Sequence, residues 1–454
     1  MKRIRILPIH MIPLSFLAVI LSGALLLMLP AATAPGAETD FLTALFTATT
    51  SVCVTGLVVV DTYAHWTVFG QFIILLLIQI GGLGVVSVVS MLFLISRKKF
   101  ALGDRMLLGD SLNIDKKKGL LSFLLRMFRL VFVVETAGAV LCAIRFVPDM
   151  GFSKGLWASL FQAVSAFCNA GMDILGPDSL IRYNDQPLIL LVTMFLIVTG
   201  GLGFVVLLDL IDGCKESVKR RFPPSVFFRH LPEHSKIVLL MSAVLILSGA
   251  ACFMAAEYRN PGTMGGMNFG QKVLNSFFQS VTLRTAGFAT IPQENLTELS
   301  CMAGYVLMFI GGSPVGTAGG IKTVTVFLIF MNALSYIRGK KETVVFHKRV
   351  SGELMRKASA IFLISLMTVS IMTFLLMTRG GLKHTDALYE VISALGTVGV
   401  SRAITPTLDS AGKIMIIISM FLGRVGPISM AIFFTKRTGS PDTVRHAEGT
   451  FFVG

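Results

Sequence analysis

Four segments of the sequence share one pattern, in which an aromatic residue precedes a glycine by ten positions. The shared glycines are separated by 115, 116 and 112 residues. A pattern that recurs at this interval indicates four copies of one structural unit in a single chain. The four segments are LFTATTSVCVTGL (45–57), LFQAVSAFCNAGM (160–172), SFFQSVTLRTAGF (276–288) and LYEVISALGTVGV (388–400), with Gly56, Gly171, Gly287 and Gly399 in register.

A second glycine motif follows each of these segments and completes the unit. It reads IGGLG (80–84), TGGLG (199–203), IGGSP (310–314) and LGRVG (422–426). Long apolar runs lie before the first motif, at 11–29, 122–147, 236–257 and 355–378, and around the second, at 66–95, 187–211, 301–336 and 412–435. The sequence therefore predicts four repeats at 1–96, 97–214, 215–340 and 341–436, and a cytoplasmic C-terminal tail at 437–454.

The lengths of these segments predict how each repeat meets a membrane. A helical crossing needs about 20 apolar residues, so the long runs can span and the segment of about 12 residues before the first glycine cannot. That segment must enter and leave on the same side. We therefore expect an all-α polytopic membrane protein with eight transmembrane helices and four re-entrant pore helices, in a pseudo-four-fold arrangement around a central pore.

Composition and charge placement agree with a membrane protein and exclude a soluble enzyme. Hydrophobic residues make up 54% of the chain and charged residues 14%, against about 25% in soluble domains. The net charge is +15, with Lys and Arg gathered at the N-terminus, 97–129, 215–236, 338–357 and the tail. This positive-inside pattern predicts a multi-pass plasma membrane protein with both termini cytoplasmic, and argues against nucleic-acid binding. The basic stretches 97–118 and 338–349 could also dock an acidic cytosolic partner.

Reactive side chains show no catalytic or metal-binding pattern. The six cysteines have no close spacing and the seven histidines are scattered near loops and membrane ends. We therefore expect free thiols, no enzyme activity and no organic cofactor. The basic and apolar start of the chain resembles a secretory signal, but it fills the first slot of the repeat, so we interpret it as a retained span.

The four aligned glycines predict a cation site made of backbone. Non-helical backbone at membrane depth is tolerated where it is buried in protein or lines water. No ring of carboxylates accompanies these glycines, so the ligands would be carbonyl oxygens, which can replace the hydration shell of K⁺. The predicted K⁺ selectivity filter comprises Val54, Thr55, Gly56, Asn169, Ala170, Gly171, Thr285, Ala286, Gly287, Thr397, Val398 and Gly399.

The apolar run 301–336 is too long for one straight crossing and contains GGSPVGTAGGIKT (311–323). Its glycines and proline forbid a continuous helix, so we expect half-helices at about 301–310 and 323–336. The motif resembles a phosphate-binding loop, but Ile321 spoils the spacing and no strand precedes it. We interpret it as a flexible gate beneath the filter, with passive helix kinking as the alternative. The predicted gate residues are Gly311, Gly312, Ser313, Pro314, Gly316, Thr317, Gly319, Gly320, Lys322 and Arg424.

Two arginines stand where the other repeats have small or neutral residues. Arg424 replaces the glycine found at positions 82, 201 and 312, and we expect it to repel cations or to bond the loop's carbonyls. Lys322 could do the same or extend toward the cytosol. Arg284 lies three residues before Gly287; it either tunes the field of the filter or braces the pore helix against a carbonyl.

The motifs CVTGL, CNAGM, LRTAGF and GTVGV, with the glycine-rich break in repeat 3, resemble the Ktr/Trk/HKT superfamily of potassium transporters, most closely the bacterial KtrB-type membrane subunits. The resemblance implies K⁺ as the transported ion, Na⁺ as activator or coupling ion, a homodimer in the lipid bilayer, and a separate cytosolic RCK-type nucleotide-binding ring of the KtrA/KtrC kind. In the plant relatives a serine at the first filter glycine accompanies sodium selectivity, so Gly56 favours potassium.

One other class of protein remains an alternative, a secondary transporter of another cation or small solute built from inverted repeats. Such repeats have opposite topologies and often a buried charged site. Here all four repeats share one predicted orientation and mild residues line the predicted axis, which favours the filter.

Overall fold

The computed structural model describes residues 8–85, 87–88, 120–221, 224–379 and 381–426. These residues are helical apart from loops and one two-stranded hairpin. The predictions made for Lys2, Arg3, Arg5, the stretch 97–118 and the tail 437–454 lie outside the described residues.

Within the bounds of each predicted repeat, a long helix is followed by a shorter helix, which we call the pore helix, and by a second apolar helix. Repeat 1 holds α1 (Pro8–Leu27), α2 (Phe41–Cys53), α3 (Thr62–His65) and α4 (Val68–Leu83); repeat 2 holds α7 (Leu120–Met150), α8 (Phe152–Cys168), η1 (Ser179–Tyr183), α9 (Pro187–Leu202) and α10 (Phe204–Arg220). Repeat 3 holds α11 (Pro224–His230), α12 (Glu233–Glu257), α13 (Phe269–Thr282), η2 (Gln293–Asn295), α14 (Glu298–Phe309) and α15 (Thr323–Ile337). The strands β1 (Val344–Val345) and β2 (Lys348–Arg349) precede α16 (Gly352–Met377), α17 (His384–Gly396), η3 (Thr405–Thr407) and α18 (Ser410–Val425) of repeat 4.

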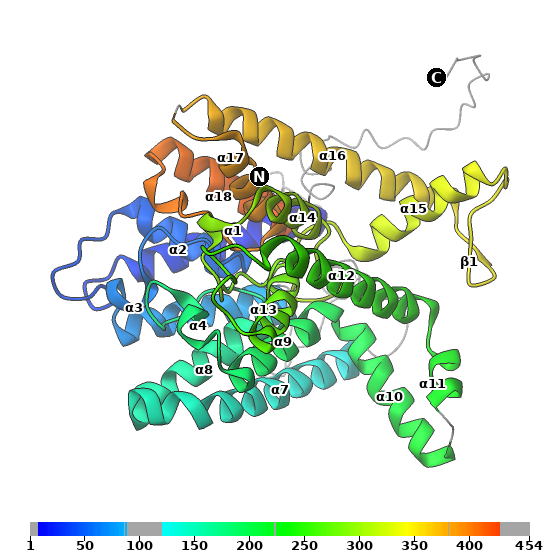
Figure 1. The fold of residues 1–454 in the computed structure, drawn as a ribbon, viewed down its shortest axis with the longest axis horizontal. Helices are drawn as coiled ribbons and strands as arrows, with labels where there is room; N and C mark the ends of the chain where they lie inside the picture. Colours follow the sequence, from blue (N-terminus) through cyan, green and yellow to red (C-terminus); the bar gives the residue numbers. More distant parts are fainter. Residues whose placement is uncertain (1–7, 86, 89–119, 222–223, 380, 427–454) are drawn as a thin grey trace, which may run out of the picture.

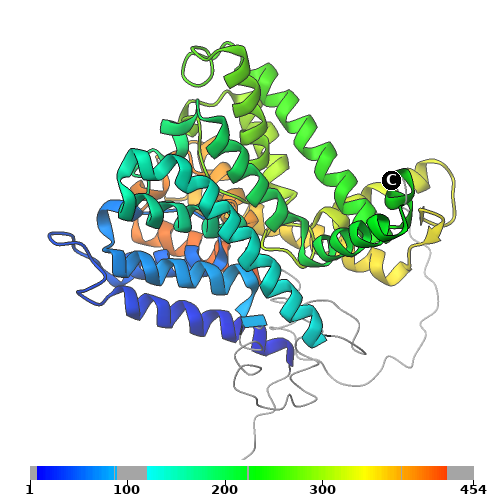
Figure 2. The ribbon, with the colours of Figure 1, turned by 90° about the horizontal axis from the view of Figure 1, so that it is seen from below.

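The repeats close into a ring (Figure 1). Helix α4 of repeat 1 packs on pore helix α8 of repeat 2, α9 packs on α13, and α14 packs on α17. The ring closes where α18 of repeat 4, in orange, returns to pore helix α2 of repeat 1, in blue (Figures 1 and 2). The four pore helices α2, α8, α13 and α17 therefore each touch a helix of the next or the previous repeat.

Polar side chains cap the starts of two pore helices, α2 and α13. Asp40 caps α2 by accepting a hydrogen bond from the backbone N–H of Thr43 at 3.0 Å, and Asn268 and Gln271 form a capping box at the start of α13. Buried hydroxyls lie inside the ring, whereas large apolar side chains face outward: Phe132, Phe195 and Phe374 are 72%, 61% and 70% exposed. This is the distribution expected of a protein surrounded by lipid.

In repeats 1, 2 and 4 the second apolar helix is interrupted at the second glycine motif, so the apolar runs 66–95, 187–211 and 412–435, which we expected to form long helices, are not continuous helices. Residues 86, 89–95 and 427–435 of these runs lie outside the described residues. Helices α4, α9 and α18 end at Leu83, Leu202 and Val425. The next residues, Gly84, Gly203 and Gly426, all have positive φ, which an α-helix does not continue through. After Gly203 the chain turns by 102° into α10. In repeat 3 the predicted break is present, between α14 and α15.

Three helices among the described residues, α7 from Ser122, α12 and α16, are long and apolar enough to cross a membrane. The bent pair α9 and α10 would count as a fourth. The remaining apolar helices in the described part of the chain are shorter, and among them α4, α14 and α15 end at the breaks described above.

Candidate functional site

The chain leaves each pore helix through a residue in the left-handed conformation, two positions before the aligned glycine. Three of these residues are β-branched, and such residues adopt positive φ at a cost of roughly 1–2 kcal/mol. The residues are Val54 (φ 54°), Asn169 (φ 58°), Thr285 (φ 68°) and Thr397 (φ 51°).

The residue before each glycine is bonded to its own pore helix in all four repeats. The backbone N–H groups of Thr55, Ala170, Ala286 and Val398 each donate to a carbonyl five or four residues earlier, at 2.8 Å. Hydroxyls of the pore helices complete the attachment. Thr50 accepts from the N–H of Gly56 at 3.0 Å, and Ser393 accepts from the N–H of Gly399 at 3.1 Å. Ser165 and Thr282 donate to the carbonyls of Met172 and Phe288 at 2.5 and 2.7 Å.

The four segments that follow the pore helices bring their carbonyls together in a closed ring, which we call the carbonyl ring (Thr55, Ala170, Ala286 and Val398). A Cβ on Gly56 would lie 2.6 Å from the carbonyl oxygen of Ala170, one on Gly171 2.5 Å from that of Ala286, and one on Gly287 2.7 Å from that of Val398. The carbonyl oxygen of Thr55 similarly meets Gly399, which closes the circle. Glycine is required at these positions because any side chain would collide with the next repeat.

Buried hydroxyls beside the carbonyl ring have no hydrogen-bond partner within the described structure. The Oγ1 atoms of Thr55, Thr285 and Thr397 are all fully buried and unpaired. A buried polar group without a partner costs about 1–3 kcal/mol, so such groups mark a place where water or an ion completes the bonding. In repeat 2 Asn169 differs, because its amide can donate to the carbonyls of Ala166, Phe167 and Ile197, each at 3.2 Å.

An outer cavity of about 530 Å³ opens on one side of the carbonyl ring, lined in part by the four aligned glycines. Acidic residues at its wall are Asp61, Asp173, Asp178 and Glu294. Asp173 accepts hydrogen bonds from Ser179 Oγ at 2.5 Å and from the N–H of Leu175 at 3.2 Å. Burial nevertheless raises the pKa of the Asp173 carboxyl to about 6, and the negative charge of Asp61 adds to the rise.

The segment 310–322 between α14 and α15, which we call the gate loop, lies on the other side of the ring. Thr317 donates from Oγ1 to the carbonyl of Phe167 at 3.0 Å and lies 3.3 Å from the Asn169 amide. The N–H of Ser313 donates to the carbonyl of Gly201 at 3.0 Å. Gly319 packs so closely on Thr397 that a Cβ there would overlap the threonine hydroxyl. The loop therefore contacts repeats 2 and 4 directly beneath the filter segments.

Arg424 and Lys322 both bond the gate loop through its carbonyls. Arg424 donates from Nη1 to the carbonyl of Thr317 and from Nη2 to the carbonyl of Gly81, with Gly82 O at 3.3 Å. It thus ties the loop to the end of α4. Lys322 donates from Nζ to Ala318 O at 2.7 Å.

Arg284 lies behind the filter of repeat 3. Its side chain is 7% exposed and donates to the hydroxyl of Ser242 at 3.3 Å, while its Nε has no partner in the described structure. The partner is therefore a hydroxyl of α12, and the carbonyl that we considered as a brace is not bonded.

Two groups of residues at the site were missed in the sequence. The first is the set of pore-helix hydroxyls Thr50, Ser165, Thr282 and Ser393; a Ser or Thr six residues before the glycine in three repeats was the available signal. The second is Glu135 of α7, 8% exposed, which accepts from Gln79 Nε2 at 3.1 and 3.2 Å beside Cys168. The only feature of the sequence that could have indicated Glu135 is that it is an acidic residue within an apolar run.

Other chemistry is absent from the described residues. All six cysteines are free, as expected. Among the described side chains, no group of three His, Cys, Asp or Glu residues could hold a metal ion. The gate loop follows a helix rather than a strand, so the context of a phosphate-binding loop is missing.

Comparison with known proteins places these features in one family. Residues 9–446 match the TrkH model, described as cation transport protein. The chain is 38% identical to the Ktr system potassium uptake protein B of Bacillus subtilis over 453 residues, covering 100% of this chain and 98% of that protein. It is 34% identical to the potassium/sodium uptake protein NtpJ of Enterococcus hirae, with the same coverage. The fold resembles the crystal structure of the potassium transporter TrkH from Vibrio parahaemolyticus, with a TM-score of 0.75 at 15% identity over 96% of this chain and 86% of that one.

Proposed function

The chain belongs to the TrkH family of cation transport proteins and is a transporter, not an enzyme. From this premise we propose that it is the ion-conducting membrane subunit of a Ktr-type potassium uptake system. The observation that carries the proposal is the carbonyl ring, in which each of the four repeats presents a carbonyl oxygen to the glycine of the previous repeat.

The carbonyl ring suits K⁺ because neutral oxygens can replace its hydration shell without holding the ion as tightly as carboxylates would. The unpaired hydroxyls of Thr55, Thr285 and Thr397 add oxygen ligands on the side facing the gate loop. The predicted filter is thus Val54–Gly56, Asn169–Gly171, Thr285–Gly287 and Thr397–Gly399. The left-handed φ of the first residue in each triplet supports it, since strained backbone of this kind clusters at functional sites.

The gate loop is the proposed barrier on the inner side. Its bonds to the end of α8 and to Gly201, and its attachment to Arg424, hold it beneath the ring. Passage of an ion would require these bonds to break. The acidic outer cavity would collect cations on the opposite side.

The proposed topology, oligomeric state and regulation rest on membership of the family and on the pattern of helices. We propose eight crossings and four re-entrant pore helices in four repeats, both termini in the cytoplasm of a plasma membrane protein, and a homodimer. Regulation would come from a cytosolic nucleotide-binding ring of the KtrA/KtrC kind. The relative in Enterococcus hirae is named for potassium and sodium, which supports Na⁺ as activator or coupling ion.

Flux of ⁸⁶Rb⁺ into proteoliposomes containing the purified chain tests the proposal. We expect uptake that K⁺ competes strongly and that Na⁺ competes weakly. Uptake of an organic solute, with no Rb⁺ flux under any gradient, would instead support the secondary transporter alternative.

A further inference from the structure

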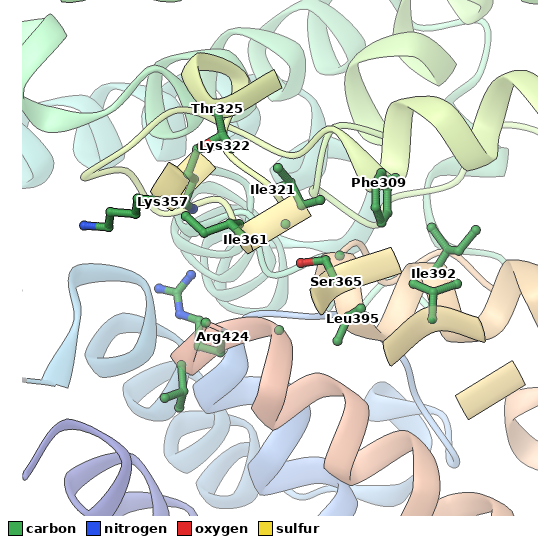
Figure 3. Close-up of a pocket in the computed structure, with 16 residues that line it drawn as sticks. Phe309, Ile321, Lys322, Thr325, Lys357, Ile361, Ser365, Ile392, Leu395 and Arg424 are labelled. Carbon is green, nitrogen blue, oxygen red and sulfur yellow. The ribbon is translucent and has the colours of Figure 1, made fainter. Parts of the chain in front are cut away.

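A second cavity, of about 290 Å³, lies on the inner side of the carbonyl ring, between the gate loop and helices α16, α17 and α18. Figure 3 shows it, and we call it the inner cavity. It reaches Gly396, the residue just before the filter residue Thr397, and includes Ile321 and Lys322 of the gate loop. Anything bound here would touch the gate loop directly.

The inner cavity carries three positive side chains and no negative one among the described residues. Lys322, Lys357 and Arg424 line it, and their charged ends lie toward the same side in Figure 3. Lys357 is exposed and has no hydrogen bond or ion pair within the described part of the chain. Lys322 and Arg424 are bonded only to neutral backbone carbonyls, so three positive charges without an acid favour an anion at this place.

Apart from Thr325 and Ser365, the side chains in the rest of the lining are apolar, and they indicate what kind of anion fits the cavity. Phe309, Ile361, Val369 and Leu395 form walls beyond the charged end. Helix α16, which supplies Lys357 and Ile361, also presents Leu363, Met367 and Phe374 outward. A charged end beside an apolar, lipid-facing helix matches an amphiphile, and basic pockets between transmembrane helices on the cytoplasmic side bind anionic headgroups.

We propose that the inner cavity binds the headgroup phosphate of an anionic phospholipid, and that this binding favours release of the gate loop. The inference rests on the proposed function, because it concerns the gate of the same pathway.

Phosphate binding is coupled to release of the gate loop because the phosphate and the carbonyls of the loop compete for the same two side chains, Arg424 and Lys322. Arg424 now donates to Thr317 O and Lys322 to Ala318 O, which are neutral carbonyls. A phosphate forms charge-assisted hydrogen bonds, which are roughly twice as strong as those to neutral acceptors. A phosphate bound beside Lys357 therefore draws Arg424 and Lys322 away from the carbonyls of the loop and weakens its attachment.

The test reconstitutes the full chain in vesicles of phosphatidylcholine with increasing fractions of phosphatidylglycerol. Two readouts are taken, ⁸⁶Rb⁺ flux and the immobilised fraction of spin-labelled phosphatidylglycerol. Lys357→Gln is compared with Arg356→Gln, its exposed neighbour on α16 that does not line the cavity. We expect wild-type flux to rise with the phosphatidylglycerol fraction, and Lys357→Gln to need a roughly fivefold higher fraction for half-maximal flux and binding. Arg356→Gln should behave as wild type.

Three results would overturn the inference. The first is flux and lipid immobilisation that do not depend on phosphatidylglycerol, as expected if a segment of this chain or a second copy fills the cavity. The second is an equal response of Lys357→Gln and Arg356→Gln. The third is full stimulation by inorganic phosphate in pure phosphatidylcholine, which would assign the site to a soluble anion. Absence of Rb⁺ flux at every composition would contradict the proposed function instead, while the spin-label binding would still test the cavity.

Discussion

Thr317 donates a hydrogen bond from Oγ1 to the carbonyl oxygen of Phe167, at 3.0 Å, and so joins the gate loop to the last turn of pore helix α8. Phe167 stands two residues before Asn169, the first residue of the proposed filter in repeat 2. Movement of the loop therefore breaks a bond at the base of the filter. The loop and this filter strand are coupled by geometry, without any intervening element.

Replacing Thr317 with Val should raise ion flux. The substitution keeps the shape of the side chain and removes the donor, and a hydrogen bond of this kind contributes about 1 kcal/mol net. The population of the released loop should rise roughly fivefold, measured as the initial rate of ⁸⁶Rb⁺ uptake. Thr368→Val is the matched control, because Thr368 bonds only the carbonyl of Ile364 in its own helix. Equal rates for the two variants would contradict the gating role of Thr317.

Replacing Gly56 with Ser should weaken the preference for K⁺ over Na⁺. A Cβ at this position would lie 2.6 Å from the carbonyl oxygen of Ala170, so the carbonyl must move out of the ring. Strain of about 1–2 kcal/mol corresponds to a loss of roughly five- to thirtyfold in the ratio of K⁺ to Na⁺ flux.

Gly36→Ser is the control for backbone strain alone. Gly36 also has a positive φ, of 86°, but no atom lies within 4 Å of its Cβ position. It should retain the wild-type selectivity. If Gly56→Ser keeps its selectivity in a well-folded protein, the filter assignment is wrong.

Replacing Arg424 with Gln should also increase flux, and by more than Thr317→Val does. Arg424 bonds the gate loop and the end of α4 at once, and hydrogen bonds from a charged donor contribute about 1.5–3 kcal/mol each. We expect at least a tenfold rise in ⁸⁶Rb⁺ uptake, about what 1.4 kcal/mol gives. Lys413→Gln on the same helix is the control. A decrease in flux from monodisperse Arg424→Gln protein would show that the arginine helps conduction rather than closure.

Much of this arrangement could be predicted from the sequence, because the aligned glycines recur at nearly constant spacing. The register of the four glycines predicted four segments of one kind, and the glycines and proline around Pro314 predicted the break between α14 and α15. Both inferences needed only the spacing of residues along the chain and the length of a membrane crossing.

What escaped prediction depends on contacts between repeats. The left-handed conformation of Val54 and Thr397 is imposed by the ring and opposes their own preference for β backbone. The ends of α4, α9 and α18 at Gly84, Gly203 and Gly426 were missed, because a single glycine in an apolar run costs only about 1 kcal/mol and does not by itself end a helix.

Replacing Arg402 with Ala should destabilise the outer loops, and Arg402 itself does not line the outer cavity. Arg402 follows the filter of repeat 4 and bonds Asp386 Oδ1 at 2.7 Å, Glu294 O at 3.0 Å and Gln293 O at 3.2 Å, which fastens repeat 4 to repeat 3. The pair is largely buried, at 16% and 19% exposure, so its loss should cost about 2–4 kcal/mol. The midpoint of heat-induced loss of monodisperse protein should fall by several degrees. Arg379→Ala, which removes only the exposed ion pair with Asp409, should leave it unchanged.

Acidification outside should slow uptake at low K⁺ through Asp173. Its pKa lies at about 6 because it is buried, so the carboxyl is mainly ionised at pH 7 and mainly neutral at pH 5. The outer cavity then loses one of its negative charges and attracts fewer cations. The apparent KM for Rb⁺ should rise as the external pH falls through about 6, with little change at saturating Rb⁺. Asp173→Asn should have the raised KM at pH 7 and a flatter pH profile, whereas Asp185→Asn, on an exposed residue that does not line the outer cavity, should keep the wild-type profile. A pH profile unchanged by Asp173→Asn would assign any acid inhibition to another group.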